Sequence, residues 1–153
     1  MKTLLIISDT HNMGLSSLPE RLLTAMDEAD YILHLGDGEA DIQALKRCYG
    51  GKLLFVRGNN DTTGEKERTE VIGGCKILLT HGDLYGVRTR LEKLAERAKA
   101  ESASCVMFGH THRQLITEQD GVTFINPGSL RDGGTYCYAN ASGGSIYAVP
   151  CRI

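Results

Sequence analysis

The sequence lacks an apolar run long enough to cross a bilayer, a marked excess of either charge, and any closely spaced pair of cysteines. Its apolar runs fall far below the roughly 18–20 residues that a transmembrane helix needs. The apolar segment Met1–Ile7 leads directly into polar Ser8–His11, so it has neither the long hydrophobic core nor the cleavage site of a signal peptide. We therefore expect a cytoplasmic protein that does not bind a membrane.

The charges are nearly balanced, with 17 basic and 19 acidic residues and a formal net charge of −2. Basic side chains alternate with acidic ones, as in Glu92-Lys93 and Glu96-Arg97. Such a surface has no general attraction for polyanions. We therefore expect no general nucleic-acid binding, although a phosphate ester could still be drawn to a bound metal ion.

The five cysteines are an odd number and are widely spaced, without a CxxC pair. Disulfide frameworks and thiolate zinc sites need even-numbered or tighter patterns. Cys75 and Cys105 lie in apolar runs, which is typical of small core residues. The sequence therefore predicts neither disulfides nor a cysteine metal site.

A length of 153 residues, with 41% hydrophobic and 24% charged residues, is typical of one globular domain. No repeat, low-complexity tract or linker divides the chain. We therefore expect a single domain over residues 1–153, and the sequence leaves open whether it forms a homo-oligomer.

The first half alternates apolar strands with helical patterns. Thr3–Ser8, Asp30–Leu35 and Lys52–Arg57 are the predicted strands. A Ser cap and an early Pro indicate a helix beginning near Ser16–Glu20, and a second helix is predicted over Glu39–Tyr49. This order predicts a parallel sheet with right-handed crossovers.

The second half is less regular and is richer in strands. Helical spacing of apolar residues predicts an amphipathic helix over Gly86–Ala100. The remaining predicted strands are Arg68–Ile72, Lys76–Thr80, Ser104–Phe108, Leu115–Thr117, Val122–Ile125, Thr135–Tyr138 and Ser145–Val149. Two sheets with helices outside them would account for this mixture, so the sequence favours an α/β (α+β) fold.

Small polar clusters follow five of the predicted strands. They are Ser8-Asp9-Thr10-His11, Gly36-Asp37, Gly58-Asn59-Asn60-Asp61, His81-Gly82 and Gly109-His110-Thr111-His112. Ligands of open α/β sheets bind just beyond the carboxyl ends of the strands. We therefore expect these clusters to converge on one edge of the protein.

The converging side chains include seven candidate metal ligands. They are Asp9, His11, Asp37, Asn59, His81, His110 and His112. Most of the motifs are weak by themselves, because a lone D-x-H arises by chance and Gly-Asp after a strand is often only a turn. Gly109-His110-Thr111-His112 is a stronger signal, because alternating histidines on an extended segment could serve separate ions. Together they suit two neighbouring Mn²⁺, Fe²⁺, Co²⁺, Ni²⁺ or Zn²⁺ ions with one bridging carboxylate. Two ions roughly 3.5–4 Å apart can clamp a phosphoryl group and yield a hydroxide nucleophile near neutral pH.

The ordered motifs D-x-H, G-D, G-N-x-D, H and G-H-x-H resemble those of the calcineurin-like metallophosphoesterase family. The small size and Asn126-Pro127-Gly128-Ser129 are similar to its compact bacterial and archaeal phosphodiesterase branch, which shares its fold with Vps29. The resemblance implies a four-layer α/β/β/α sandwich of two mixed sheets flanked by helices. It also implies a dinuclear-metal phosphoesterase, a phosphodiesterase in particular, with Mn²⁺ as the favoured cofactor and a small phosphoester as the substrate.

The resemblance also assigns roles to the candidate ligands. By that assignment one ion is held by Asp9, His11 and His112, and the second by Asn59, His81 and His110. Asp37 then bridges the two ions. The rival expectation is a catalytically weak or inactive protein-interaction scaffold of the Vps29 type, which an incomplete ligand set would favour. All seven positions are filled here.

Two further residues are candidate catalytic groups. Asn60 occupies the position at which many family members carry a histidine that assists the leaving group; an amide can donate a hydrogen bond but cannot act as a general acid. Asp61 is a candidate for orienting a neighbouring group, and a turn role suits it nearly as well. His34 is interpreted as a core histidine rather than a ligand. Arg113 and Arg131 could reach a substrate phosphate, although solvated arginines are the more common outcome.

Overall fold

The computed structural model describes residues 1–153, with ten strands in two five-stranded sheets. In spatial order, the first sheet contains β10 (Ser145–Arg152), β9 (Thr135–Ser142), β1 (Lys2–Ile7), β2 (Tyr31–His34) and β3 (Leu53–Phe55). The second contains β4 (Glu67–Ile72), β5 (Cys75–Thr80), β6 (Cys105–Met107), β8 (Val122–Pro127) and β7 (Gln114–Gln119). The helices are α1 (Glu20–Glu28), α2 (Glu39–Tyr49) and α3 (Glu92–Ala100).

The first sheet has a parallel centre, as the sequence predicted. Strand β2 pairs in parallel with both β1 and β3, and α1 and α2 form the crossovers. Side chains of β1 alternate between two environments: Leu4 and Ile6 pack between the sheets, whereas Leu5 and Ile7 pack against the helices. A strand covered on both faces must be apolar at every position, which explains its continuous hydrophobic run.

The C-terminal hairpin completes the first sheet. Strand β9 pairs antiparallel with β1, so that Leu5 lies opposite Tyr138, and β10 forms the outer edge. This pairing joins residues more than 130 positions apart in the chain, and no local pattern indicated it. The N-terminal strand therefore lies at the centre of its sheet.

The second sheet packs against the first on one face and against α3 on the other. Leu78, Val106 and Phe124 project from its strands toward α3. They meet Leu94 and Ala98 of that helix, and all five side chains are buried. Helix α3 thus buries its apolar stripe against strands from three different parts of the chain.

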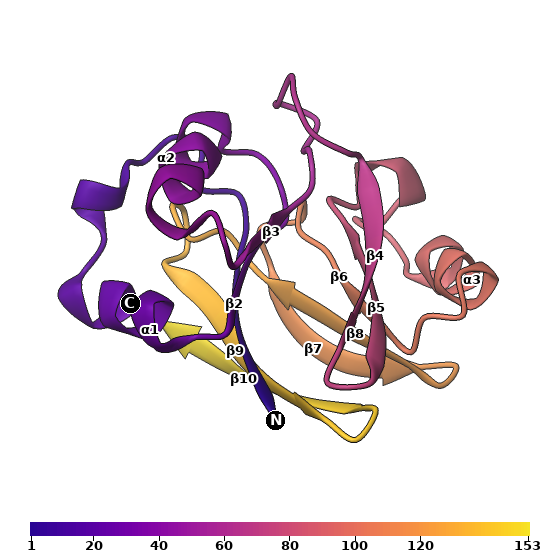
Figure 1. Cartoon of the computed structure of the whole chain (residues 1–153). Helices are drawn as coiled ribbons and strands as arrows, with labels where there is room; N and C mark the ends of the chain where they lie inside the picture. The colour runs from indigo at the N-terminus through magenta and orange to yellow at the C-terminus, as the bar shows by residue number, and fades with distance from the viewer.

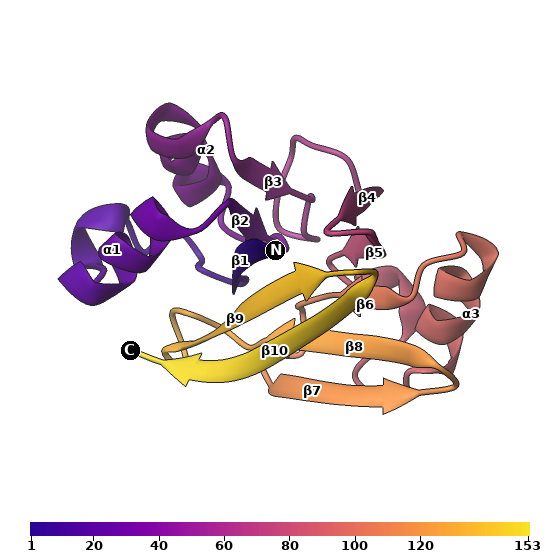
Figure 2. The ribbon, with the colours of Figure 1, turned by 60° about the horizontal axis from the view of Figure 1, so that its bottom comes forward.

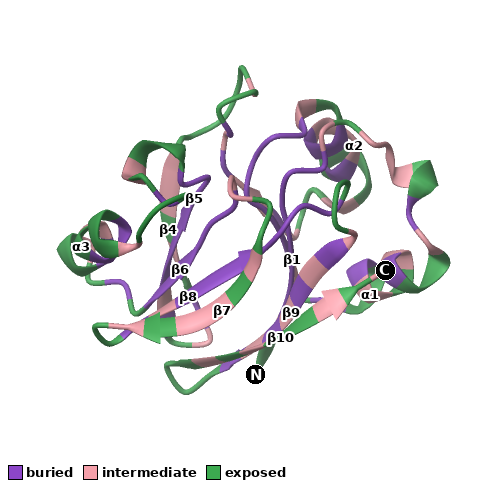
Figure 3. Cartoon of the chain, turned by 180° about the vertical axis from the view of Figure 1, so that it is seen from behind, coloured by how far each residue is buried: buried purple, intermediate pink, exposed green.

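Four layers result, and they confirm the expected α/β/β/α sandwich. Figure 1 shows α1 and α2 outside the first sheet and α3 outside the second. After a turn of the view, the β9–β10 and β7–β8 ribbons lie next to each other (Figure 2). The central strands are largely buried, whereas the edge strands β4, β7 and β10 and the outward faces of the helices carry exposed residues (Figure 3). None of the helices has the length and apolarity that crossing a membrane requires.

One predicted helix start and one predicted helix cap were wrong. Helix α3 begins at Glu92 rather than Gly86, because Gly86 adopts a left-handed conformation with φ +60° and its carbonyl accepts turn bonds from the backbone N–H groups of Thr89 and Arg90. β-Branched Val87 and Thr89 also have a low helix propensity, which disfavours a helix in this segment. Near the N-terminus, 3₁₀ turn Leu15–Ser17 precedes α1, which starts at Glu20 without a side-chain cap.

Candidate metal centre

All seven candidate ligands lie in loops that leave one edge of the two sheets, as expected, and Asn59 is in the loop after β3. Asp9 and His11 follow β1, Asp37 follows β2, His81 follows β5, and the two remaining histidines follow β6. The candidate ligand atoms form two groups, each within 4.8 Å: Asp9 with His11 and His112, and Asp9 with Asp37 and His81. Strands of both sheets therefore contribute to one site.

The Asp9 carboxylate lies at the centre of this cluster and is fully buried. Its Oδ2 accepts hydrogen bonds from Ser8 Oγ at 2.6 Å and from the backbone N–H of His110 at 3.1 Å. Its Oδ1 has no hydrogen-bond partner. Nε2 of His112 is 3.2 Å from Oδ1, and Nε2 of His11 and of His81 are each 3.8 Å away.

An unpaired buried carboxylate oxygen is costly, so this one requires an explanation. Imidazole nitrogens also face each other at 3.3 Å, between His11 Nε2 and His112 Nε2 and between His81 Nε2 and His110 Nδ1. Facing lone pairs repel unless a proton or a cation lies between them. A carboxylate oxygen surrounded by imidazoles is a donor set that divalent transition metals favour, so the residues fit such ions.

His81 is held so that one ring nitrogen faces the cluster. Its Nδ1–H donates to the backbone carbonyl of Leu35 at 2.7 Å, and its Nε2 lies 3.2 Å from Oδ2 of Asp37. Burial by itself would lower the pKa of His81, but the hydrogen bond with Asp37 and the charge of Asp9 outweigh it and raise that pKa. In the neutral ring the Nε2 lone pair must point into the cluster.

Asp37 is held by its neighbours in the ionised form. Asn60 donates to it twice, from the backbone N–H at 2.8 Å and from Nδ2 at 3.0 Å. Burial would raise the pKa of Asp37, but the hydrogen bonds from His81 and Asn60 lower it to about 2. The carboxylate is therefore negatively charged at neutral pH.

Three side chains that position the ligands were not predicted from the sequence. Asp132 Oδ2 lies 2.9 Å from Nδ1 of His112, Arg88 donates through Nε to His110 Nε2 at 3.2 Å, and Ser8 binds Asp9. Burial and the positive charges of His81 and Arg88 lower the pKa of His110. Asp132 and Arg88 belong to no recognisable spacing, whereas Ser8 could have been found by its place beside Asp9.

The remaining candidates adjoin the ligand cluster but do not point ligand atoms into it. Asn59 is exposed, and no hydrogen bond connects its side chain to the cluster. The Asp61 carboxylate accepts from the backbone N–H groups of Asp37 at 2.8 Å, Gly58 at 2.8 Å and Gly38 at 3.1 Å, which gives it a positioning role. Arg131 donates to the backbone carbonyl of His11 at 3.1 Å.

His34 is a core histidine, as interpreted from the sequence. Its ring is fully buried, its Nδ1 accepts from the backbone N–H of Gly36 at 3.1 Å, and its Nε2 therefore donates to Thr10 Oγ1 at 2.9 Å. Burial lowers its pKa to about 4. Both ring nitrogens are used, so His34 supports the loop between the ligands and is no ligand itself.

Backbone strain concentrates at this site. Eight non-glycine residues have positive φ, and five of them are candidate ligands: Asp9, His11, Asp37, His110 and His112. Such conformations are uncommon outside glycine and cluster at functional sites. The adjoining glycines allow close approach, since a Cβ at Gly58 would lie 2.1 Å from Asp37 Oδ1 and one at Gly109 would lie 2.7 Å from Asp9 Oδ2.

One detail differs from what the resemblance implied. Asp37 was expected to bridge the two ions, but the carboxylate common to both groups in the structure is Asp9. Asp37 belongs only to the group with His81. Which carboxylate bridges stays a prediction, as does the full ligand set.

The chain belongs to the calcineurin-like phosphoesterase superfamily, whose domain model matches residues 1–142. It is 36% identical over 135 residues to the probable metallophosphoesterase YsnB of Bacillus subtilis, covering 83% of this chain and 74% of that protein. The family assignment therefore agrees with the resemblance in the motifs and supports a metal-binding hydrolase.

Two solved structures share the fold. Entamoeba histolytica Vps29 complexed with Zn²⁺ has a TM-score of 0.78 at 20% identity over 98% of each chain. A novel archaeal phosphodiesterase has a TM-score of 0.75 at 21% identity, over 97% of this chain and 99% of that one. At these identities the likeness shows the fold alone.

Proposed function

We propose that this protein is a metal-dependent phosphoesterase that holds two divalent transition-metal ions and hydrolyses a small phosphoester, preferentially a diester. The observation that carries the proposal is the buried Oδ1 of Asp9, which has no hydrogen-bond partner and is surrounded by three imidazole nitrogens. A cation beside this oxygen would remove the cost of burying it.

The residues divide into two ligand groups. Asp9, His11 and His112 would hold one ion, and Asp9, Asp37 and His81 the other. His110 and Asn59 would complete the second group, as the resemblance to the family implies. When bound, such ions supply positive charge to the phosphoryl oxygens and lower the pKa of water for attack on phosphorus. Mn²⁺ is the ion that the resemblance to the family favours, and the mixed oxygen and nitrogen donors suit Fe²⁺, Co²⁺, Ni²⁺ and Zn²⁺ as well.

The protein's own groups prepare this chemistry. The hydrogen bonds from Asn60 keep Asp37 ionised, so its charge is available without deprotonation at neutral pH. The Leu35 carbonyl and the Asp132 carboxylate fix His81 and His112 with Nε2 toward the cluster. These contacts pre-organise the donors and reduce the reorganisation that binding requires.

The leaving-group side of the site carries no general acid at Asn60. Its amide donates to Asp37 and cannot transfer a proton near neutral pH. Catalysis then depends on charge stabilisation and favours esters with good leaving groups. The diester preference follows the resemblance of the motifs to the compact phosphodiesterase branch of the family.

The test is hydrolysis of bis-p-nitrophenyl phosphate by purified protein with and without added Mn²⁺. We expect turnover that depends on the metal and that falls at least about a hundredfold in Asp9→Asn. Asp120→Asn is the matched control, because it makes the same chemical change at an exposed residue in a turn. Absence of metal-dependent turnover in the unmodified protein would favour the Vps29-type scaffold.

A further inference from the structure

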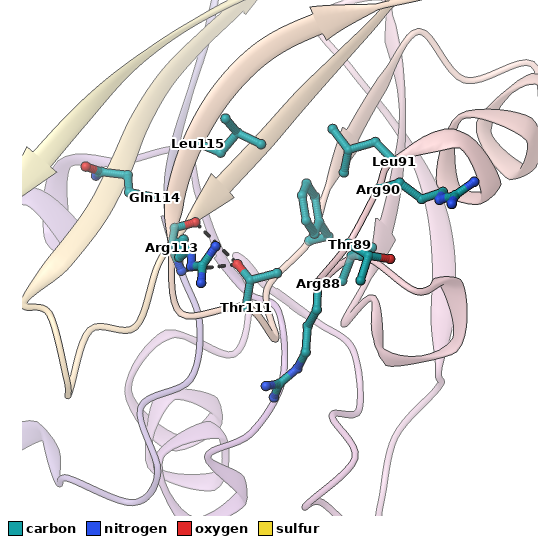
Figure 4. Close-up of a pocket in the computed structure, with 10 residues that line it drawn as sticks. Arg88, Thr89, Arg90, Leu91, Thr111, Arg113, Gln114 and Leu115 are labelled. Carbon is teal, nitrogen blue, oxygen red and sulfur yellow. Dashed lines mark hydrogen bonds between the residues drawn. The ribbon is translucent and has the colours of Figure 1, made fainter.

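A cavity of about 400 Å³ lies beside the candidate metal centre (Figure 4). Its walls come from the turn before α3, from the end of β6 and from the start of β7. We call it the arginine cavity; it is lined by Val87, Arg88, Thr89, Arg90, Leu91, Phe108, Thr111, Arg113, Gln114 and Leu115. Its volume lies in the range of small-molecule sites, roughly 300–1,000 Å³.

The cavity adjoins the metal centre through Arg88 and Thr111. Arg88 lines it and also donates to Nε2 of His110 at 3.2 Å. Thr111 lines it and stands between the two histidines of the Gly109–His112 motif, where Asn126 Nδ2 donates to its hydroxyl at 3.0 Å. A phosphoester whose phosphorus lies at the metal centre can therefore extend its organic group into the cavity.

The charge of the cavity is of one sign. Three arginines line it and no carboxylate does. None of these arginines forms an ion pair, whereas Arg68 and Arg97 elsewhere on the surface are both paired with glutamates. Figure 4 shows Arg88 and Arg113 extending at one end of the cavity and Arg90 pointing away from them. Two unpaired guanidinium groups thus remain for an anion, and planar guanidinium groups bind phosphate well.

The opposite end of the cavity is apolar. Leu91 and Leu115 lie there in Figure 4, and buried Val87 and Phe108 complete the lining. Leu115 is 38% exposed and lends its aliphatic side chain to this wall. An apolar wall beside two arginines suits a ligand with a planar or aliphatic body and an anionic end.

We propose that the arginine cavity binds the organic group of the substrate and selects nucleotide-sized groups that carry a second phosphate in addition to the one hydrolysed. This inference rests on the proposed function, because it assigns a substrate class to the same site. Arg88 and Arg113 would bind the second phosphate, and the apolar wall would contact the sugar and base. A simple diester such as bis-p-nitrophenyl phosphate has no group for the two arginines.

Two esters with the same leaving group test the proposal. They are the p-nitrophenyl ester of thymidine 5′-phosphate and the p-nitrophenyl ester of thymidine 3′,5′-bisphosphate, which differ only in the second phosphate. With Mn²⁺ present, we expect kcat/KM to be at least tenfold higher for the bisphosphate ester. Arg113→Gln should reduce this ratio about tenfold, whereas Arg47→Gln, the same change on the exposed face of α2, should leave the ratio unaltered.

A ratio near one in the unmodified protein, or a ratio that survives in the Arg88→Gln/Arg113→Gln double variant, would overturn the proposal. Failure of the proposed function is recognised separately, because then no ester is hydrolysed, bis-p-nitrophenyl phosphate included. In that case, calorimetry with thymidine 3′,5′-bisphosphate and thymidine 5′-phosphate decides the question. Tighter binding of the bisphosphate that is lost in Arg113→Gln supports the cavity, and equal binding refutes it.

Discussion

His112 lies between two carboxylates: its Nδ1 is 2.9 Å from Oδ2 of Asp132, and its Nε2 is 3.2 Å from Oδ1 of Asp9. Because Asp132 accepts the Nδ1 proton, the neutral ring presents its Nε2 lone pair to the buried carboxylate. Carboxylates in this position orient metal-binding histidines and raise their basicity. The loop after β8 therefore acts on a ligand that follows β6.

Replacing Asp132 should weaken metal binding more than stability. We expect Asp132→Ala to raise the Kd for Mn²⁺ about tenfold, the lower end of the usual range, because the Asp132 side chain is 56% exposed. Asp132→Asn should lose less, since its amide oxygen can accept the same hydrogen bond. Calorimetric titration measures both. Equal affinity in all three proteins would mean that the contact does not orient His112.

Replacing Asp9 should separate stability from metal binding. In Asp9→Asn the amide can donate to His112 Nε2 where Oδ1 now has no partner. We therefore expect the variant in EDTA to be as stable as the unmodified protein, or more stable by about 1 kcal/mol. Mn²⁺ at a hundred times Kd should stabilise only the unmodified protein, by about 2.7 kcal/mol. Thermal unfolding with and without the metal tests this, and equal stabilisation of both proteins would contradict it.

Asp61 should contribute to the stability of the loops around Asp37 and Gly58 rather than to the reaction. Its carboxylate accepts from three backbone N–H groups around Asp37 and Gly58, so Asp61→Ala leaves them without a protein partner. We expect a loss of about 2–3 kcal/mol in the free energy of unfolding, measured in urea. Asp61→Asn, which keeps one acceptor oxygen, should lose less. A variant with unchanged stability but lost activity would instead assign Asp61 to the reaction.

Asn60→His should extend the range of leaving groups. A histidine at this exposed position could donate a proton to the leaving oxygen, which the amide cannot do. We expect kcat/KM for a phenyl ester to rise by roughly tenfold or more, with little change for the p-nitrophenyl ester. Asn60→Ala controls for the loss of the hydrogen bond to Asp37. No gain with the phenyl ester would argue against the dependence on leaving groups.

His34 should make stability fall at mildly acidic pH. Burial lowers its folded-state pKa to about 4, below the unfolded value of roughly 6.5, so the unfolded chain binds the proton first. The stability that neutral His34 contributes to the fold is fully present above pH 6.5 and is lost as the pH falls toward 4. We expect a loss of about 3 kcal/mol over this interval from His34.

The comparison with His34→Gln isolates this effect, because other histidines titrate in both proteins. The free energy of unfolding, measured in urea at several pH values in EDTA, should fall less steeply for the variant between pH 6.5 and 4. Parallel curves would show that His34 keeps an ordinary pKa in the folded protein.

Local sequence patterns predicted the strands and helices whose burial follows one regular pattern along their length. The continuous apolar run of Thr3–Ser8 predicted a strand buried on both faces, and β1 lies between a helix layer and the second sheet. The start of α3 was predicted too early because the spacing of Val87 and Leu91 fits the apolar face of a helix. In the structure Gly86 is left-handed, and Val87 is buried from a turn that precedes the helix.

The sequence by itself determined which side chains stand at the ends of the buried strands, because an apolar run must end where polar groups can be satisfied. It thereby determined the family and most of the candidate ligands. The tertiary structure decided the pairing of β9 with β1, the carboxylate shared by the two ligand groups and the contact between Asp132 and His112. These contacts join residues from about 20 to more than 130 positions apart, and such distances close only when the sheets pack, which no local pattern encodes.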